Sequence, residues 1–207
     1  MPLPIHMPHR ELILGSTSPY RRELLARLRL TFAVVAPQVD ETPLVAEAPA
    51  TIALRLALAK ANAVALSHPA AIVIGSDQVA DFNGMPLGKP GDHTRATAQL
   101  RLMRGQRVVF QTAVAVVCLN TGFAACELAT SSVRFRDVSD TEIEHYLLAE
   151  RPYDCAGSAK SKGLGIALLD DIHSDDPTAL IGLPLIRTSR LLREAGLNAL
   201  LPQAHLA

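Results

Sequence analysis

Short apolar runs alternate along the chain with longer segments in which apolar residues have helical spacing. Uninterrupted apolar runs bounded by glycine or polar residues predict buried strands at 11–15, 32–36 and 71–75. The first run is followed by Ser18 and Pro19, which favour a helix with serine as its N-cap and proline at its first position. Helices are predicted at about 19–28, 51–67, 94–103, 140–148 (with Ser139 as its cap) and 185–194.

Two longer strand-like runs, Val108–Leu119 and Ala125–Phe135, flank the turn signal Asn120-Thr121-Gly122. Long adjacent strands joined by a turn predict an antiparallel hairpin, whereas strands that alternate with helices predict parallel pairing. The chain is therefore expected to be α/β, with a mixed, mostly parallel sheet, flanking helices and two lobes around a cleft. Residues 1–10 are expected to be a loose tail, and residues 11–207 a single domain.

Composition narrows the class of protein. Hydrophobic residues make up 49% of the 207 residues and charged residues 19%, which favours a sizeable core over disorder. Lys plus Arg and Asp plus Glu both total 20, and this neutral balance argues against a nucleic-acid surface. The aromatic content of 4% also disfavours RNA binding. A small cationic pocket for one phosphorylated ligand is still compatible with these values.

The sequence shows neither a signal peptide nor a membrane span. The opening MPLPIHMPHR lacks the apolar run of a signal peptide. The apolar stretch 51–66 contains Arg55, Lys60 and Asn62, whereas a membrane helix needs about 20 mainly apolar residues. There are three cysteines, Cys118, Cys126 and Cys155, an odd number without CxxC spacing. They are therefore expected to be buried thiols rather than metal ligands or catalytic residues. We expect a cytoplasmic protein without a membrane partner.

The segment Gly15–Arg22 is the first candidate site. A strand, a turn of small residues and a helix N-terminus present free backbone N–H groups, and the helix dipole favours an anion there. Arg21 and Arg22 place two cations in the first turn, where they oppose the dipole unless they share an anion. The alternative is two solvated arginines with Glu23 as a neighbour.

Two acidic segments follow predicted strands. Asp40 and Glu41 come soon after the second strand, and adjacent carboxylates can hold a hard cation, although a solvated turn is the simpler interpretation. Asp77, in Gly75-Ser76-Asp77-Gln78, is expected at the carboxyl end of the most hydrophobic strand, where α/β proteins bind ligands. A helix cap or a turn-forming aspartate is the alternative there.

Three further segments carry weaker signals. Lys89 lies in a glycine-rich segment that lacks the P-loop pattern, so by itself it is an exposed lysine. The acid-rich segment 170–176 does not have calcium-loop spacing and is expected to be a solvated loop. The sequence contains neither an HExxH motif nor a GxSxG elbow.

Taken in order, these segments resemble the Maf family of nucleoside triphosphate pyrophosphatases, particularly the branch that acts on 7-methyl-GTP. The resemblance runs from about Leu12 to about Leu200. Its motifs are Ser16-Thr17-Ser18-Pro19-Tyr20-Arg21-Arg22, Val39-Asp40-Glu41-Thr42-Pro43, Lys60, Gly75-Ser76-Asp77-Gln78, Gly88-Lys89-Pro90, Cys155-Ala156-Gly157-Ser158 and Gly182-Leu183-Pro184-Leu185.

The resemblance implies an enzyme that cuts a nucleoside triphosphate between its α- and β-phosphates, with a divalent cation such as Mg²⁺ or Mn²⁺. It implies that Asp77 accepts the proton of water and that Glu41 and Asp77 lie near the metal. The residues that would contact the triphosphate are Ser16, Arg21, Arg22, Lys60 and Lys89. A homodimer is suggested by the resemblance alone. The rival interpretation is a regulatory protein that binds a nucleotide without cutting it.

Base choice in this family is associated with three positions, which here carry Tyr20, Gln78 and Lys162. The methylguanine branch is expected to have Trp, Gln and Glu there. Tyr20 keeps a ring that can stack, Gln78 matches, and Lys162 reverses the expected charge. The sequence therefore predicts 7-methyl-GTP or a related modified nucleotide as substrate, with reduced discrimination between bases.

Overall fold

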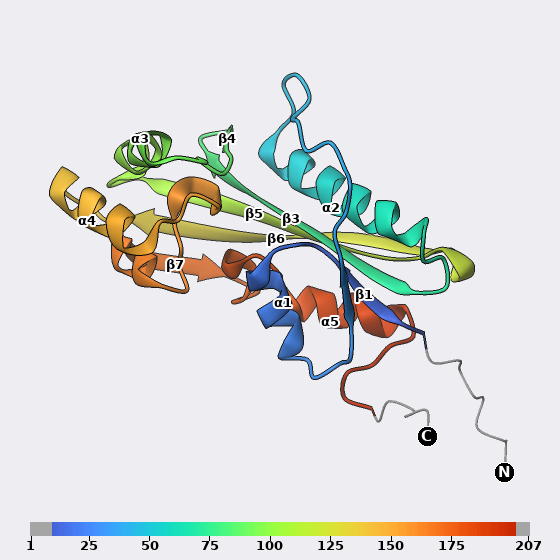
Figure 1. The fold of residues 1–207 in the computed structure, drawn as a ribbon. Coiled ribbons are helices and arrows are strands. Elements are labelled where there is room, and N and C mark those ends of the chain that lie inside the picture. The colour runs from blue at the N-terminus through green and yellow to red at the C-terminus, as the bar shows by residue number, and fades with distance from the viewer. Residues whose placement is uncertain (1–9, 202–207) are drawn as a thin grey trace, which may run out of the picture.

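Residues 10–201 are described by a computed structural model, in which one seven-stranded sheet carries helices on both faces (Figure 1). The predicted tail, except Arg10, lies outside the described residues. The strands are β1 (Leu12–Gly15), β2 (Ala33–Val35), β3 (Ile72–Phe82), β4 (Met85–Leu87), β5 (Arg107–Cys118), β6 (Phe123–Phe135) and β7 (Leu169–Ser174). The α-helices are α1 (Pro19–Ala26), α2 (Pro49–Ala65), α3 (His93–Met103), α4 (Asp140–Glu150) and α5 (Leu185–Glu194). Short 3₁₀ helices are η1 (Leu119–Thr121), η2 (Ala156–Ser158), η3 (Leu164–Leu168) and η4 (Ala179–Ile181).

The sheet has the order β2-β1-β3-β5-β6-β7, with β4 paired to β3. The predicted α/β class, the mixed sheet and the flanking helices are confirmed. Parallel pairing, expected for most of the sheet, is confined to β1 with β2 and β1 with β3; the other pairs are antiparallel. β5 and β6 are antiparallel because the turn that joins them, ending at Gly122, is too short for a parallel connection.

β1 and the first half of β3 are buried on both faces, which explains why their sequences are apolar without alternation. Leu12 and Leu14 pack with α1 and α5 on one face of the sheet. Ile13 and Val73 point the other way and pack under α2. The period of two along each strand thus divides one apolar run between two cores.

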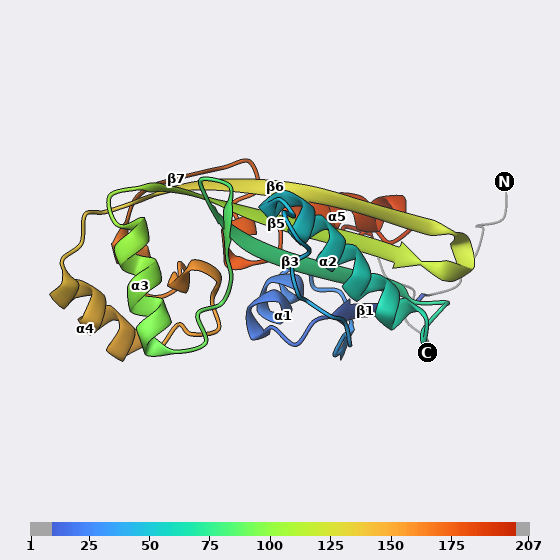
Figure 2. The same cartoon turned by 90° about the horizontal axis from the view of Figure 1, so that it is seen from above.

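A third core lies at the other end of the sheet, where α3 and α4 cover it (Figure 2). Phe110, Phe135 and Leu100 are buried there. β3, β5 and β6 are long enough to pass from this core to the one beneath α2. The molecule therefore has an α1–α2–α5 end and an α3–α4 end, joined by continuous strands (Figures 1 and 2).

Two predictions about local structure were wrong. β3 does not stop at Gly75 but continues to Phe82, because β5 pairs with its polar segment and places Asp77 opposite Ala113. The acid-rich segment 170–176 is largely β7, paired with β6. Asp176 is buried rather than solvated, because its carboxylate accepts from the backbone N–H of Arg187 in the first turn of α5 (3.1 Å).

No helix within residues 10–201 has the length and apolar character to cross a membrane. Of the cysteines, all of them free, Cys118 is buried as expected, whereas Cys126 and Cys155 are only partly buried.

Candidate active site

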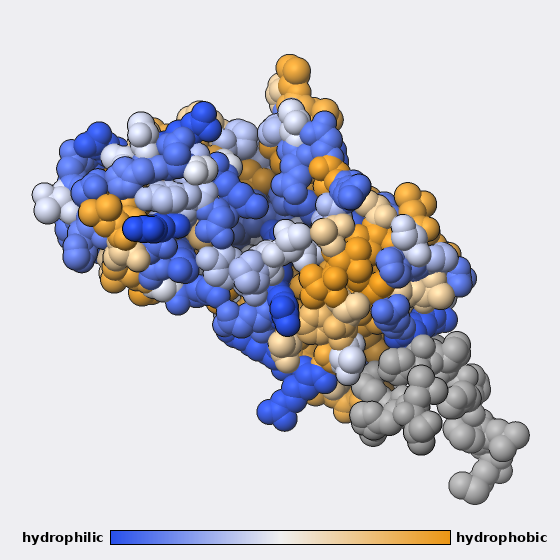
Figure 3. Space-filling model, viewed as in Figure 1, coloured by the Kyte–Doolittle hydropathy of each residue, from blue (hydrophilic) through white to orange (hydrophobic). Residues whose placement is uncertain are grey.

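A pocket with a volume of about 310 Å³ lies between the two ends of the molecule. It opens where β1 and β3 separate, because their parallel pairing ends at Gly15 opposite Gly75 and the chain after Gly15 turns into α1. Figure 3 shows this side of the molecule hollowed between the α3–α4 end and α2, with mainly hydrophilic residues around the hollow. The pocket is lined by residues of 16–21, 37–41, α2, β3, Lys89, 154–162 and 180–182.

A buried lysine between two carboxylates forms the floor of the pocket. Lys60 Nζ lies 2.7 Å from Oδ1 of Asp77 and 2.8 Å from Oε1 of Glu41. Lys60 and Asp77 are 4% and 7% exposed, whereas the Glu41 side chain is 53% exposed. Partial burial favours the neutral form of Glu41, but the hydrogen bond from Lys60 and the charges of Lys60 and Lys89 outweigh it and lower the pKa of Glu41.

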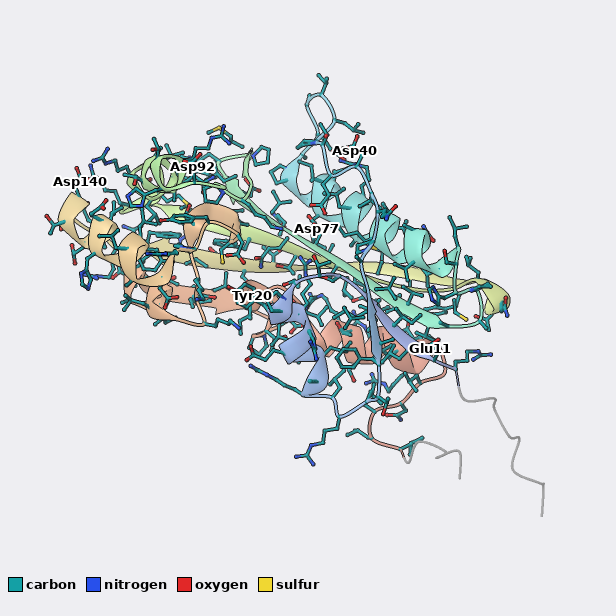
Figure 4. The ribbon with its side chains drawn as sticks, in the orientation of Figure 1. Glu11, Tyr20, Asp40, Asp77, Asp92 and Asp140 are labelled. Carbon is teal, nitrogen blue, oxygen red and sulfur yellow. The ribbon has the colours of Figure 1, made fainter. Side chains whose placement is uncertain are left out.

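Lys60 reaches Asp77 because α2 lies unusually close to β3. The buried stripe of α2 has the spacing i, i+1, i+4, i+5, and Lys60 follows Leu56 in it. A side-chain carbon added at Gly75 would lie 2.2 Å from the backbone oxygen of Ala57 and 2.6 Å from the backbone nitrogen of Ala61. Glycine at position 75 therefore sets the spacing that lets the ammonium reach the neighbouring carboxylate (Figure 4, Asp77 below α2).

Arg21 provides a second cation, on the α1 side of the pocket. Its Nε donates to the backbone oxygen of Gly182 (2.9 Å) and its Nη1 to Oγ of Ser16 (3.4 Å). Burial lowers the pKa of Arg21 and the carboxylates of Asp77 and Glu41 oppose this shift, but a guanidinium remains charged in proteins. The two hydrogen-bond acceptors of Arg21, the backbone oxygen of Gly182 and Oγ of Ser16, are neutral, so the guanidinium can still bind an anion.

The turn before α1 has the predicted construction, with Ser18 as N-cap accepting from the backbone N–H of Arg21 (3.4 Å). Arg22, by contrast, is exposed and does not line the pocket; it borders a shallow groove on the other side of this turn. Lys89 is exposed and lines the pocket. Of the five predicted triphosphate contacts, the structure therefore brings together all except Arg22.

At the other end of the pocket, the ammonium of Lys162 lies 4.0 Å from the centre of the Tyr20 ring. The same ammonium pairs with Oε2 of Glu23 (2.7 Å), so Lys162 covers one face of the ring and its charge is balanced. Burial, followed by the nearby Cys155 and Asp154, raises the pKa of Tyr20 to about 12, so its hydroxyl is neutral at ordinary pH. Tyr20, at the start of α1, and Asp77, on β3, are labelled in Figure 4.

Gln78 has a fixed orientation. Its Nε2 donates to Oγ1 of Thr112 (2.9 Å) and to the backbone oxygens of Ala179 (2.9 Å) and Leu180 (3.1 Å). Thr112 in turn donates to the oxygen of Ala179 (3.0 Å), so its Oγ1 can only accept from Gln78. Within residues 10–201, Oε1 of Gln78 has no donor, which leaves an acceptor in the wall of the pocket.

The loop that carries Glu41 is anchored to α2. Arg55 donates to both carboxylate oxygens of Glu47 (2.6 and 2.7 Å) and to the backbone oxygen of Thr42 (3.2 Å). The carboxylate of Asp40, for which a solvated turn was the simpler interpretation, accepts from the backbone N–H of Thr42 (2.9 Å) and does not line the pocket. Glu41 therefore points to Lys60 from a loop held at two points.

The polar lining residues Asp154 and Lys160 were assigned no role from the sequence, and Cys155 appeared there only as part of a motif. The motif Cys155-Ala156-Gly157-Ser158 marked their segment, but no spacing related Asp154 to the rest of the site. Burial raises the pKa of Cys155 to about 11, so this thiol is protonated and is no nucleophile at neutral pH. Residues 10–201 contain no group of three His, Cys, Asp or Glu side chains that could hold a metal ion by themselves.

Comparison with known proteins shows the family to which the chain belongs. The family model described as "Maf-like protein" matches residues 11–195. A protein named 7-methyl-GTP pyrophosphatase from Polaromonas sp. (strain JS666) is 69% identical over 187 residues, covering 90% of this chain and 85% of that protein. A protein of the same name from Albidiferax ferrireducens is 65% identical over 191 residues, covering 92% of this chain and 96% of that protein. The chain that places Lys60, Asp77 and Arg21 around one pocket therefore belongs to the Maf family.

Proposed function

We propose that this protein is a nucleoside triphosphate pyrophosphatase that converts 7-methyl-GTP, or a related modified nucleotide, to the monophosphate and pyrophosphate. The observation that carries the proposal is the group formed by Lys60, Asp77 and Arg21 in a pocket large enough for part of a nucleotide. The names of its relatives support the choice of 7-methyl-GTP.

The cations of the pocket suit a triphosphate chain. Hydrolysis of such a chain requires that its negative charge be neutralised and that the reacting phosphorus be held in place. Arg21 and Lys89 form no ion pair within residues 10–201, and Lys60 is shared between two carboxylates. We propose that phosphate oxygens bind Arg21 and Lys89 directly, and that Ser16 and Lys60 contribute the remaining contacts.

Glu41 and Asp77 also fit a divalent cation that arrives with the substrate. Their carboxylates converge on one point, now taken by the Lys60 ammonium. Mg²⁺ is usually held by one or two carboxylates together with substrate phosphates and water, so two protein carboxylates are sufficient. When bound there, Mg²⁺ or Mn²⁺ would neutralise phosphate charge and polarise the phosphorus–oxygen bonds.

The chain itself would supply the base. We propose that a carboxylate oxygen of Asp77 accepts the proton of the water that attacks the α-phosphorus, while Arg21 holds the phosphates. The bond between the α-phosphorus and the bridging oxygen breaks, and pyrophosphate leaves.

Hydrolysis in ¹⁸O-water tests this proposal. The purified protein with Mg²⁺ or Mn²⁺ should convert 7-methyl-GTP to 7-methyl-GMP and pyrophosphate, with ¹⁸O in the monophosphate as read by mass spectrometry. Activity should disappear in EDTA and return when the metal is added again. A diphosphate with labelled orthophosphate would show cleavage at the γ-phosphorus, and saturable binding without products would indicate the regulatory binding protein instead.

A further inference from the structure

The charged residues at the two ends of the pocket are paired differently. At the end near Tyr20, Lys162 pairs with Glu23 (2.7 Å) and Lys160 pairs with Glu150 (2.6 Å). Both lysines of this end therefore have their charge balanced by carboxylates that do not line the pocket.

Asp154 is the exception among the carboxylates of the pocket. Glu41 and Asp77 both pair with Lys60, whereas Asp154 forms no ion pair within residues 10–201. Its only hydrogen bond there is a weak one, from Sγ of Cys155 to Oδ1 (3.6 Å). Asp154 is exposed and lines the same pocket as Tyr20.

The pocket is consequently polarised along its length. Its floor holds three cations, Lys60, Arg21 and Lys89, against the two carboxylates of Glu41 and Asp77, and its Tyr20 end holds Asp154, a carboxylate in no ion pair within residues 10–201. A ligand that matches this arrangement carries negative charge at one end and positive charge at the other. Ordinary nucleoside triphosphates have neutral bases, whereas the 7-methylated purine ring is cationic.

We propose that Asp154 is the residue that selects a positively charged, 7-methylated guanine base, resting on the function proposed above. A carboxylate only accepts hydrogen bonds, and the N1–H and 2-amino groups of guanine are donors. The aromatic face of Tyr20 also attracts cations, as its contact with Lys162 shows. Asp154 thereby supplies the carboxylate that the methylguanine branch is expected to have at the position of Lys162.

The test compares Asp154→Asn with the wild type, using kcat/KM for 7-methyl-GTP, GTP and UTP. The control is Asp170→Asn, which removes the same charge from an exposed residue outside the pocket. Asp154→Asn should lower the preference for 7-methyl-GTP over UTP about ten- to hundredfold, because it removes the negative charge and turns one of the two acceptor oxygens into an N–H₂ donor. Its kcat for UTP should stay within about twofold of wild type, and Asp170→Asn should keep the wild-type preference.

Binding provides a readout that does not depend on turnover. In calorimetry, Asp154→Asn should lower the affinity for 7-methyl-GMP about tenfold or more. It should lower the affinity for GMP less, because GMP has the same donors without the ring charge. An unchanged preference and unchanged 7-methyl-GMP affinity in Asp154→Asn would overturn the role of Asp154. If the wild type hydrolysed none of the three triphosphates, the proposed function would fail instead, and the calorimetric comparison would still decide the inference about the base.

Discussion

The two ends of the pocket are built from different kinds of structure. At the end where we propose that the phosphates bind, the phosphate end, regular elements carry Lys60 (α2), Asp77 (the middle of β3) and Arg21 (the first turn of α1), whereas Glu41 and Lys89 lie on loops. At the end where we propose that the base binds, the base end, Tyr20 and Gln78 lie on α1 and β3, and Asp154 and Lys162 lie in the segment 151–168, which contains only short 3₁₀ helices. Lys60 and Asp77 are buried, whereas Asp154 and Lys162 are exposed.

This difference indicates a division of labour. Lys60, Asp77 and Arg21, which we propose hold the reacting phosphate, are on packed helices and a packed strand, which fix their positions. Asp154 and Lys162, which we propose act on base choice, are on an irregular surface segment, where substitutions disturb the core least. Changes at the phosphate end should therefore affect every nucleotide, and changes at the base end should affect some nucleotides more than others.

The largest effect is expected for Asp77→Asn. It keeps the shape of the side chain but removes the proposed base, so kcat should fall roughly 10²–10⁴-fold. The loss should be the same for 7-methyl-GTP, GTP and UTP, as measured by pyrophosphate release, with circular dichroism confirming that the variant is folded. Turnover near the wild-type rate, or a loss of kcat confined to one nucleotide, would show that Asp77 is not the base of the reaction.

A smaller effect is expected for Arg21→Ala, with Arg22→Ala as its matched control. Arg21 points into the pocket and Arg22 does not line it, although the two are adjacent in sequence. Loss of a charged contact to phosphate should lower kcat/KM of Arg21→Ala roughly ten- to hundredfold for all nucleotides. The kcat/KM of Arg22→Ala should stay within about threefold of the wild-type value. Equal losses in the two variants would restore the sequence-based prediction that both arginines bind the triphosphate.

The smallest effect, and one specific to the base, is expected for Lys162→Glu. The substitution removes the ammonium from the Tyr20 ring and adds a carboxylate to the end that already holds Asp154. The ratio of kcat/KM for 7-methyl-GTP to that for UTP should rise by up to about tenfold, with kcat for UTP unchanged. Glu23→Gln, which frees Lys162 without adding an anion, should not raise the ratio. Equal ratios in wild type and Lys162→Glu would show that position 162 does not contribute to base choice.

Most of the fold could be predicted from local signals. The α5 boundaries agree with the predicted ones, and Ser139 caps α4 with Glu142 in a capping box, because caps and amphipathic stripes are properties of adjacent residues. The extension of β3 through Ser76 and Asp77 could not be predicted in this way. Those polar residues resemble a turn locally, and only the partner strand β5 holds them in the sheet.

The residues of the candidate site were partly marked by local pattern and partly by resemblance. Asp77 follows an apolar run and Lys60 interrupts an apolar stripe, so each is conspicuous in the sequence, but only the family resemblance assigned Lys60 to the site. Asp154 is not conspicuous, because an aspartate in a polar loop is ordinary until the fold brings it into the same pocket as Tyr20. The pairing of Lys162 with Glu23 joins residues 139 positions apart, and no local rule relates them.

The uninterrupted strands that join the two ends have a consequence for how the pocket measures its ligand. β5 pairs with β3 over Val109–Val117 and with β6 along its entire length, so a hydrogen-bonded ladder passes beneath the pocket without a gap. A hinge needs a few unpaired residues to absorb a change in backbone angles, and this part of the sheet has none. The position of Asp77 on β3 is therefore fixed relative to the strands that run to the α3–α4 end. In the proposed reaction, the distance from the bound base to Asp77 then determines which phosphorus of the ligand is attacked.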